Sequence, residues 1–242
     1  MNLVIVRNYE EMSAKASQII GTLLKKQPDA VLGLATGSTP IGLYTNLIKM
    51  YENKEISFSN VKTYNLDEYC DLPKEHPQTY FQFMWKNLFD HIDIKKENVH
   101  IPDGNTANHE QACKEYNELL KQIKIDLQVL GIGSNGHIGF NEPGTPFEQE
   151  TFIVKLSENT RKDNQRFFAS LSEVPQYAIT MGIHNIMQAE KIVLLASGKA
   201  KAEAIKNLVE GEISIDFPAS VLKLHHHTIV IVDEEAASLL NK

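Results

Sequence analysis

The sequence predicts an α/β fold, a single-domain Rossmann-like open sheet that is mostly parallel and flanked by helices on both faces. Short apolar runs rich in β-branched residues alternate with segments of helical periodicity along the chain. Such alternation is typical of parallel strands joined by helices. No repeat, low-complexity tract or linker divides the 242 residues, so we expect one domain covering residues 1–242.

The individual elements follow from local patterns, taken in chain order. Strands are predicted from short apolar, β-rich runs: LVIVRN (3–8), AVLGLAT (30–36), VKTYNLDEY (61–69), IDLQVLGIG (125–133), KIVLLAS (191–197) and TIVIVD (228–233). Helices are predicted where apolar residues repeat at helical spacing: 9–26, a helix starting near Pro40, 80–92, 112–123, 199–209 and a short helix at the C-terminus. Asn8 and Glu11 fit a capping box at the start of the first helix.

Composition excludes several function classes. A net charge of −7 and a pI near 5.7 argue against nucleic acid and anionic membranes as partners. No apolar run approaches the roughly 18 residues of a membrane span, and the N-terminus turns acidic too early for a signal peptide. Cys70 and Cys113 lie far apart without metal-ligand spacing, as expected for reduced thiols. We therefore expect a cytoplasmic protein.

We expect a ligand to bind at three strand-end loops, because open α/β sheets bind ligands beyond the carboxyl ends of their strands. The first contains Thr36, Gly37, Ser38 and Thr39 and precedes a helix. Backbone N–H groups, hydroxyls and the helix dipole favour a bound phosphate there. The loop lacks the lysine of a P-loop, which favours a phosphate monoester over a nucleotide. A turn and cap without a ligand is the alternative.

Lysines at 199 and 201 give a second indication of an anion. They fall in the first turn of a predicted helix, where the helix dipole disfavours cations. A bound anion would explain them, although two solvated lysines are the simpler interpretation.

The second loop places Asp67 and Glu68 side by side at a strand end. Adjacent residues on extended chain point to opposite sides, so only one of them can face a pocket. Such a carboxylate could act as a general base, ligate a metal or cap a helix. Few further ligands lie nearby in the sequence, which favours the general base over a metal site.

The third loop is GIGSNGHIGFNEPG (131–144), and it begins with the spacing G-x-G-x-x-G. That spacing also occurs in dinucleotide-binding loops, which need a helix to start at the third glycine. Here HIGFNEPG follows, and its glycines and proline interrupt any helix, so we reject the cofactor interpretation. The loop carries His137 and Glu142, a pair in which a carboxylate can orient an imidazole for proton transfer.

Together these motifs resemble those of the glucosamine-6-phosphate deaminases, over essentially the whole chain. LATGSTP (34–40) is similar to the phosphate loop of that family, NLDEY (65–69) to the motif of its catalytic aspartate, and GIGSNGHIGFNEPG to its ring-opening motif. The resemblance implies conversion of glucosamine 6-phosphate to fructose 6-phosphate and ammonia, without a metal or organic cofactor.

The resemblance also implies roles for individual residues. Asp67 would move a proton between C2 and C1, and His137 would open the sugar ring with support from Glu142 and Asn135. Arg166 and Lys201 would bind phosphate, Arg166 from a mobile lid at about 156–180.

Some positions depart from the longer members of the family. Many of those have aspartate where this chain has Asn135, which can orient His137 by a hydrogen bond but carries no charge. Longer members also have a C-terminal extension, form hexamers and are activated allosterically through basic residues where this chain has Phe152 and Val154. We therefore expect no activation by N-acetylglucosamine 6-phosphate, and a monomer, with a dimer as the alternative.

Two other families and a metal site are the alternatives. In 6-phosphogluconolactonases, which resemble this chain in fold and phosphate loop, the motif at 135–143 is similar to DGHTASLFP, which has no counterpart of Glu142. A sugar-phosphate sensor domain is the non-enzymatic alternative, but no DNA-binding segment is recognisable before the domain. The run of histidines at 225–227 suggests a metal, yet alternating directions would let only two of them share one ion, so a structural or surface role is favoured.

Overall fold

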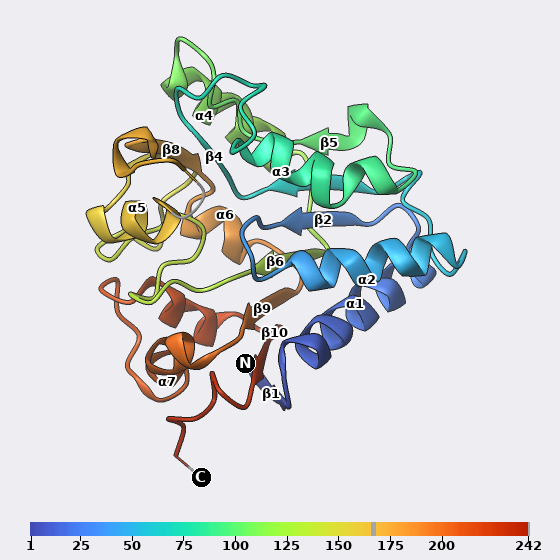
Figure 1. The fold of residues 1–242 in the computed structure, drawn as a ribbon, viewed down its shortest axis with the longest axis vertical. Helices are drawn as coiled ribbons and strands as arrows, with labels where there is room; N and C mark the ends of the chain where they lie inside the picture. The colour runs from blue at the N-terminus through green and yellow to red at the C-terminus, as the bar shows by residue number, and fades with distance from the viewer. Residues whose placement is uncertain (166–167, 242) are drawn as a thin grey trace.

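A seven-stranded sheet in which all paired strands run parallel forms the centre of the molecule (Figure 1). The computed structural model describes residues 1–165 and 168–241, without the side chains of residues 159 and 163. From one edge to the other, the strands are β1 (Asn2–Val6), β10 (Thr228–Asp233), β9 (Ile192–Ala196), β6 (Leu127–Leu130), β2 (Val31–Leu34), β3 (Lys62–Asn65) and β5 (Val99–His100). The predicted α/β fold with a mostly parallel sheet is confirmed.

The order of the strands creates a switch point between β2 and β6. From β2 the chain proceeds outward through β3 to β5, whereas from β6 it proceeds in the opposite direction through β9 to β10. The loops that leave β2 and β6 therefore diverge, and the crevice between them is where doubly wound sheets bind ligands.

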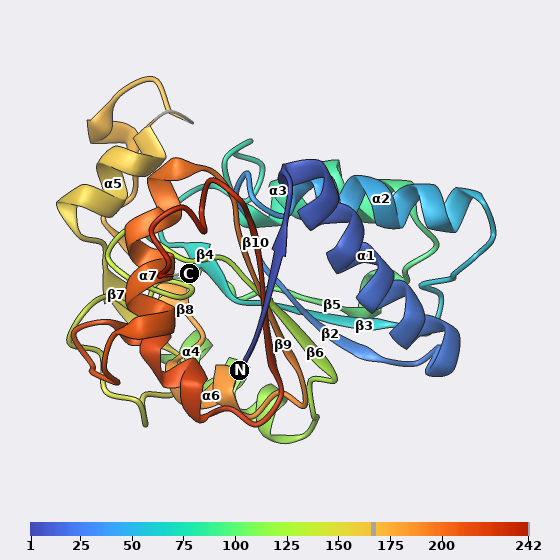
Figure 2. The same cartoon turned by 90° about the horizontal axis from the view of Figure 1, so that it is seen from below.

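Helices cover both faces of this sheet (Figure 2). One face carries α1 (Tyr9–Lys26), α2 (Ile41–Glu52) and α3 (Tyr80–Asn87), and the other carries α4 (His109–Lys121), α6 (Ile183–Met187) and α7 (Ala202–Glu210). Right-handed crossovers explain this division, since the chain moves in opposite directions on the two sides of the switch point. The predicted apolar stripe of α1 is buried at Met12, Ala16, Ile20 and Leu24.

Only half of the predicted capping box forms at the start of α1. The Asn8 side chain accepts a hydrogen bond from the Glu11 N–H at 2.9 Å, as expected. The Glu11 carboxylate, however, accepts from the backbone N–H of Arg7 and from its guanidinium, so it does not return to Asn8. The basic neighbour at position 7 offers the carboxylate a charged partner in addition to a backbone donor.

A second, smaller sheet corrects the prediction for residues 61–69. This segment is not one strand: β3 ends at Asn65, and β4 (Asp67–Tyr69) belongs to a three-stranded antiparallel sheet with β8 (Tyr177–Thr180) and β7 (Phe152–Lys155). Leu66 joins the two sheets, because its N–H donates to Leu34 and its carbonyl accepts from Met181. Polar residues lie at the junction, but they do not indicate that the chain continues as a strand of a second sheet.

Several predicted boundaries also shift. The helix expected at 80–92 ends at Asn87 and gives way to a 3₁₀ turn, and the helix expected from 199 begins only at Ala202, after a 3₁₀ turn. The prediction of a short C-terminal helix is wrong, since residues 234–239 form turns. Asp233 holds these turns by accepting from the Ala236 N–H at 2.8 Å. In the described ranges, none of the helices has the length and apolar character needed to cross a membrane.

Candidate active site

A cavity of about 510 Å³ opens at the carboxyl ends of β2, β6 and β9, over the switch point of the large sheet. It brings together the three loops expected to hold a ligand. Its lining is formed by Ala35, Thr36, Gly37, Ser38, Thr39, Leu66, Asp67, Tyr80, Gly131, Ile132, Gly133, Ser134, His137, Gly139, Phe140, Thr160, Asn164, Ser197, Ala200 and Lys201.

One end of the cavity has the features of an anion site. The loop 36–39 connects β2 to the N-terminus of α2, and all four of its residues line the cavity. Gly37 adopts a left-handed conformation with φ of +90°, and a Cβ added there would have no neighbour within 4 Å among the described residues. The loop thus lies along the cavity at a helix N-terminus, where the dipole favours negative charge.

Lys201 adds a cation to the lining of the same cavity. It precedes α7 and donates from Nζ to the carbonyl oxygen of Ile132 at 2.8 Å, which anchors the ammonium over the loop that follows β6. Lys199, in contrast, is exposed and does not line the cavity. The two lysines singled out in the sequence therefore have different environments. Arg166, the other predicted phosphate ligand, lies outside the described residues.

Asp67 lies deeper in the cavity, at the first position of β4, and only 6% of the residue is exposed. In the part of the chain that the structure describes, no hydrogen bond to its carboxyl group is formed. Burial, with a smaller contribution from the charge of Glu68, raises the pKa of Asp67 to about 8. This carboxyl group is therefore a much stronger base, once ionised, than an exposed aspartate.

Glu68 points away from this cavity, as the alternation along a strand requires. Its carboxylate accepts from the backbone N–H groups of Tyr69, Tyr80 and Phe81 at 2.9, 2.8 and 2.8 Å and so caps the start of α3. Burial raises the pKa of Glu68 to about 7 against the effect of these hydrogen bonds. Of the two adjacent acids, one lines the cavity and the other holds a helix.

The glycines of the third loop form a tight turn. The N–H of Gly133 donates to the carbonyl of His137 at 2.9 Å, and the N–H of Gly136 donates to that of Gly133 at 3.0 Å. A Cβ at Gly133 would lie 2.3 Å from Cε1 of His137, so the imidazole ring lies directly on the glycine backbone. Residues 131–144 are all described and contain turns rather than a helix, which agrees with the rejection of a dinucleotide loop.

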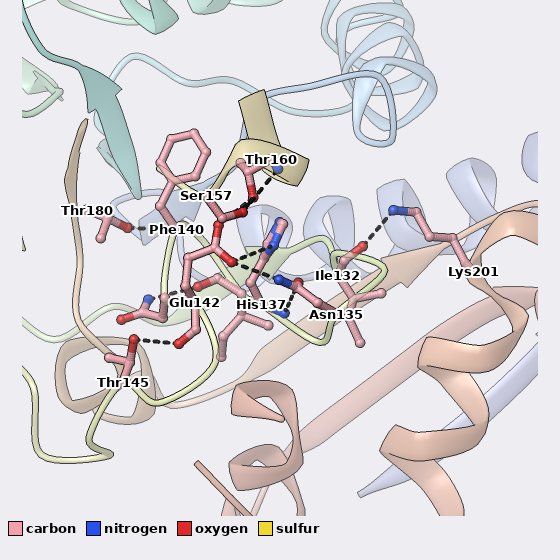
Figure 3. A network of polar contacts seen from close by, with 12 residues as sticks. Ile132, Asn135, His137, Phe140, Glu142, Thr145, Ser157, Thr160, Thr180 and Lys201 are labelled. Atoms are coloured by element: carbon pink, nitrogen blue, oxygen red, sulfur yellow. Dashed lines mark hydrogen bonds and ion pairs between the residues drawn. The ribbon is translucent and has the colours of Figure 1, made fainter. Parts of the chain in front are cut away.

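Behind His137 lies a hydrogen-bonded network centred on Glu142 (Figure 3). The amide of Asn135 donates to Oε2 of Glu142 at 2.8 Å, and the hydroxyl of Thr160 donates to Oε1. Oε2 also lies 4.0 Å from Nδ1 of His137. Each oxygen of the carboxylate therefore has a donor, and neither Glu142 nor Asn135 lines the cavity itself.

Asn135 contacts His137 through the backbone. Its Oδ1 accepts from the His137 main-chain N–H at 3.2 Å, while its amide nitrogen is used by Glu142. The hydrogen bond between these two residues thus holds the main chain of the histidine, and orientation of its ring by Asn135 stays a prediction. The neutral amide also supplies a donor to Glu142, which an ionised aspartate at this position would lack.

Sequence reasoning missed part of the site. Thr160 comes from α5 (Glu158–Asn164), far from the three motifs in sequence, and nothing in its local pattern distinguishes it. Tyr80 and Phe140 stack with ring centroids 6.1 Å apart and form an aromatic wall of the cavity. Phe140 lies within the third motif, yet only the fold brings it to a residue at the start of α3.

The histidine run has a structural role at its first position. His225 is buried, with Nε2 2.8 Å from the carbonyl oxygen of Ala189 and Nδ1 3.1 Å from the hydroxyl of Thr228. His226 is exposed. Across residues 1–165 and 168–241, no three His, Cys, Asp or Glu side chains are grouped as metal ligands would be.

Comparison with known proteins places the chain in a family. A family model described as glucosamine-6-phosphate isomerases/6-phosphogluconolactonase matches residues 7–231. The chain belongs to this family. Within the glucosamine-6-phosphate isomerase/6-phosphogluconolactonase family, proteins named glucosamine-6-phosphate deaminase are close in sequence. One from Thermoanaerobacter sp. (strain X514) is 56% identical and one from Clostridium botulinum (strain Langeland / NCTC 10281 / Type F) is 52% identical, each over 241 residues. These alignments cover 99% of this chain and 95% and 99% of the two relatives.

Solved structures of the family divide into near and distant neighbours. A monomeric glucosamine-6-phosphate deaminase has a TM-score of 0.98 and 48% identity, covering 99% of this chain and 100% of its own. A 6-phosphogluconolactonase from Trypanosoma brucei has a TM-score of 0.81 but only 19% identity, covering 99% and 98%. The second similarity extends to the fold alone.

Proposed function

We propose that the protein is a glucosamine-6-phosphate deaminase, which converts glucosamine 6-phosphate and water to fructose 6-phosphate and ammonia. The observation that carries the proposal is the content of one cavity: an anion cradle at one end, and a buried carboxyl group and an imidazole at the other. The relatives at 52–56% identity with this name support it.

The chemistry explains why Asp67 is suited to act as the base. Conversion of an aldose to a ketose removes the proton at C2 and delivers one to C1, and a single carboxylate beside both carbons can perform both steps. A base of pKa about 8 accepts a proton more readily than an ordinary carboxylate, and general bases work best when their pKa lies near the working pH. Burial next to Glu68 gives Asp67 this property without a metal ion.

His137 is suited to the step before, in which the sugar ring opens. Its ring lines the cavity, and Glu142 lies on the far side of Nδ1. In this assignment the imidazole exchanges a proton with the ring oxygen and O1 of the sugar. Glu142 and Asn135 act from outside the cavity and hold the histidine in place.

The phosphate group is assigned to the other end of the cavity. Loop 36–39 would contact its oxygens through backbone N–H groups and hydroxyls, and Lys201 would neutralise charge. Arg166 stays a prediction, as does a lid at about 156–180, of which the described part includes α5 and β8. Because the phosphate is remote from the reacting carbons, its binding energy can hold the open chain in position for proton transfer.

The wider setting is also part of the proposal. We infer a single-domain, cytoplasmic, monomeric enzyme of amino-sugar catabolism that acts in the degradation of N-acetylglucosamine and hydrolyses a carbon–nitrogen bond without a metal or organic cofactor. The monomeric state is supported by the similar monomeric deaminase of known structure.

The deciding experiment measures ammonia and fructose 6-phosphate released from glucosamine 6-phosphate, for the wild type and for Asp67→Asn. We expect the wild type to be active and the variant to lose about 10²- to 10⁴-fold in kcat, the usual contribution of a general base. An inactive wild type would contradict the activity, and a variant near the wild-type rate would contradict the role of Asp67.

The lactonase alternative is tested with the same preparation. Hydrolysis of 6-phosphogluconolactone needs no base at C2, so a lactonase would retain its rate in Asp67→Asn. Detectable lactonase activity without ammonia release would favour this alternative over the deaminase.

A further inference from the structure

The helix α5 reaches the centre of the Glu142 network through Thr160. Thr160 is 4% exposed and lines the cavity, and its hydroxyl donates to Oε1 of Glu142. The only other side-chain donor to this carboxylate in the described residues is Asn135, on the opposite oxygen. The orientation of the carboxylate thus depends on one donor from the loop after β6 and one from α5 (Figure 3).

The Thr160 hydroxyl is itself held in a fixed direction. Ser157, the N-cap of α5, accepts from the Thr160 N–H at 3.1 Å and donates its own hydroxyl proton to Thr160 Oγ1 at 2.9 Å. A threonine hydroxyl has one proton to donate. With its oxygen accepting from Ser157, that proton is directed to Glu142.

The same helix is tied to the segment that follows it. Arg161, next to Thr160, donates from Nη2 to the carbonyl oxygens of Leu171 and Val174 at 2.8 and 3.0 Å. A displacement of residues 171–174 would therefore be transmitted to α5, and through Thr160 to Glu142.

A displacement of the Glu142 carboxylate would change its distance from the ring of His137. The 4.0 Å between Nδ1 and Oε2 exceeds a hydrogen bond by about 1 Å. A small rotation of the Glu142 carboxylate decides whether the two groups bond, and an error of about 1 Å in a catalytic group can change a rate about 100-fold.

We propose that Thr160 is a positioning residue for ring opening, which fixes the Glu142 carboxylate against His137 and couples both to the position of α5. This inference rests on the proposed function, because it concerns the same imidazole. Thr160 contributes through Glu142 and His137, and it takes no part in proton removal at C2.

The test compares three variants of one position with a matched control. Thr160→Ser keeps the hydroxyl, whereas Thr160→Ala and Thr160→Val remove it, and the Ser and Ala variants differ by a single oxygen atom. Thr145→Val is the control, because Thr145 also donates to Glu142, but to its main-chain carbonyl, at 2.7 Å. Thermal unfolding shows which variants fold, and the Ser and Ala pair suffices if the Val variant does not.

Kinetics separate positioning from binding. We expect kcat for glucosamine 6-phosphate to fall about 10- to 100-fold in the Ala and Val variants, while Ser and the Thr145 control stay close to wild type. The inhibition constant of an acyclic analogue, 2-amino-2-deoxyglucitol 6-phosphate, should stay unchanged, since this ligand has no ring to open. Equal losses in Ser and Ala, or a full rate in Ala, would overturn the proposal.

A second readout does not depend on activity. The ring nitrogens of His137, observed by ¹⁵N NMR and assigned with His137→Gln, report its tautomer and hydrogen bonding. We expect these signals to change in Thr160→Ala and not in Thr145→Val, and an unchanged spectrum in Thr160→Ala would refute the coupling. If the wild type releases no ammonia, the proposed function fails, whereas the spectra still decide the role of Thr160.

Discussion

At the scale of single residues, Asp67 lies where burial destabilises its ionised carboxylate. Asp67 is 6% exposed, has an acidic neighbour in sequence and receives no hydrogen bond from the described residues. Its neighbour Glu68 is equally buried but is surrounded by three backbone donors. Two adjacent acids thus have different tasks because only one is provided with donors, and the less stabilised one is the better base.

This arrangement predicts opposite pH dependences for activity and stability. Asp67 is protonated in the folded protein up to about pH 8 but only to about pH 4 when unfolded, so its contribution to stability is full below pH 4 and is lost as pH rises toward 8. The rate should rise over the upper part of this window as the base ionises. Asp67→Asn removes the titration, and its unfolding free energy should exceed that of the wild type by an amount that grows with pH, by at most about 1.4 kcal/mol per unit.

Denaturant unfolding of both proteins at pH 5, 6, 7 and 8 measures this difference, alongside kcat/KM of the wild type. A stability difference that stays constant across these pH values would show that Asp67 titrates normally in the fold.

At the scale of elements, the sequence predicts most helices and strands of the large sheet but not the small sheet. The apolar runs of β2, β6, β9 and β10 are buried on both faces and bounded by turns, so these strands can be recognised in the sequence. The small sheet is built from three short strands distant in sequence, and β4 is continuous in pattern with β3. No local signal marks such pairing, because it depends on how the chain returns through β7 and β8 to pair with β4.

The close contact between the His137 ring and the loop after β6 can be tested by substituting the glycines of this loop. Gly133→Ala would place a methyl group within 2.3 Å of the His137 ring, so the ring must move. We expect a loss of about 1 to 3 kcal/mol in stability, as for other overpacked sites, and a large loss of kcat. Gly131→Ala is the control for stability, because in the described part of the chain no atom lies within 4 Å of a Cβ placed there.

Thermal unfolding of the two variants should separate them, with a lower Tm for Gly133→Ala and an unchanged Tm for Gly131→Ala. Equal Tm values would mean that the ring accommodates a methyl group without cost.

At the scale of the whole molecule, the location of the site is predictable because topology dictates it. Parallel strands end at one edge, so loops 36–40, 65–70 and 131–144 had to converge, and they do so at the switch point between β2 and β6. The residues within these loops could be named from the sequence. Thr160 could not, because its contact with Glu142 arises from the placement of α5 after the chain has left the large sheet.

The quaternary state provides the last prediction. Cooperative binding at equilibrium requires at least two coupled sites, and the proposed monomer offers its substrate one site, the cavity lined by Asp67 and His137. The positions at which longer relatives are expected to carry basic allosteric residues are Phe152 and Val154 in β7, and their apolar side chains pack in the small hydrophobic cluster of the antiparallel sheet. Neither apolar side chain can pair with a phosphate group.

We therefore expect sedimentation as a monomer and a hyperbolic dependence of the initial rate on glucosamine 6-phosphate, with or without N-acetylglucosamine 6-phosphate. A sigmoidal curve that this compound makes hyperbolic would reveal a second, coupled site.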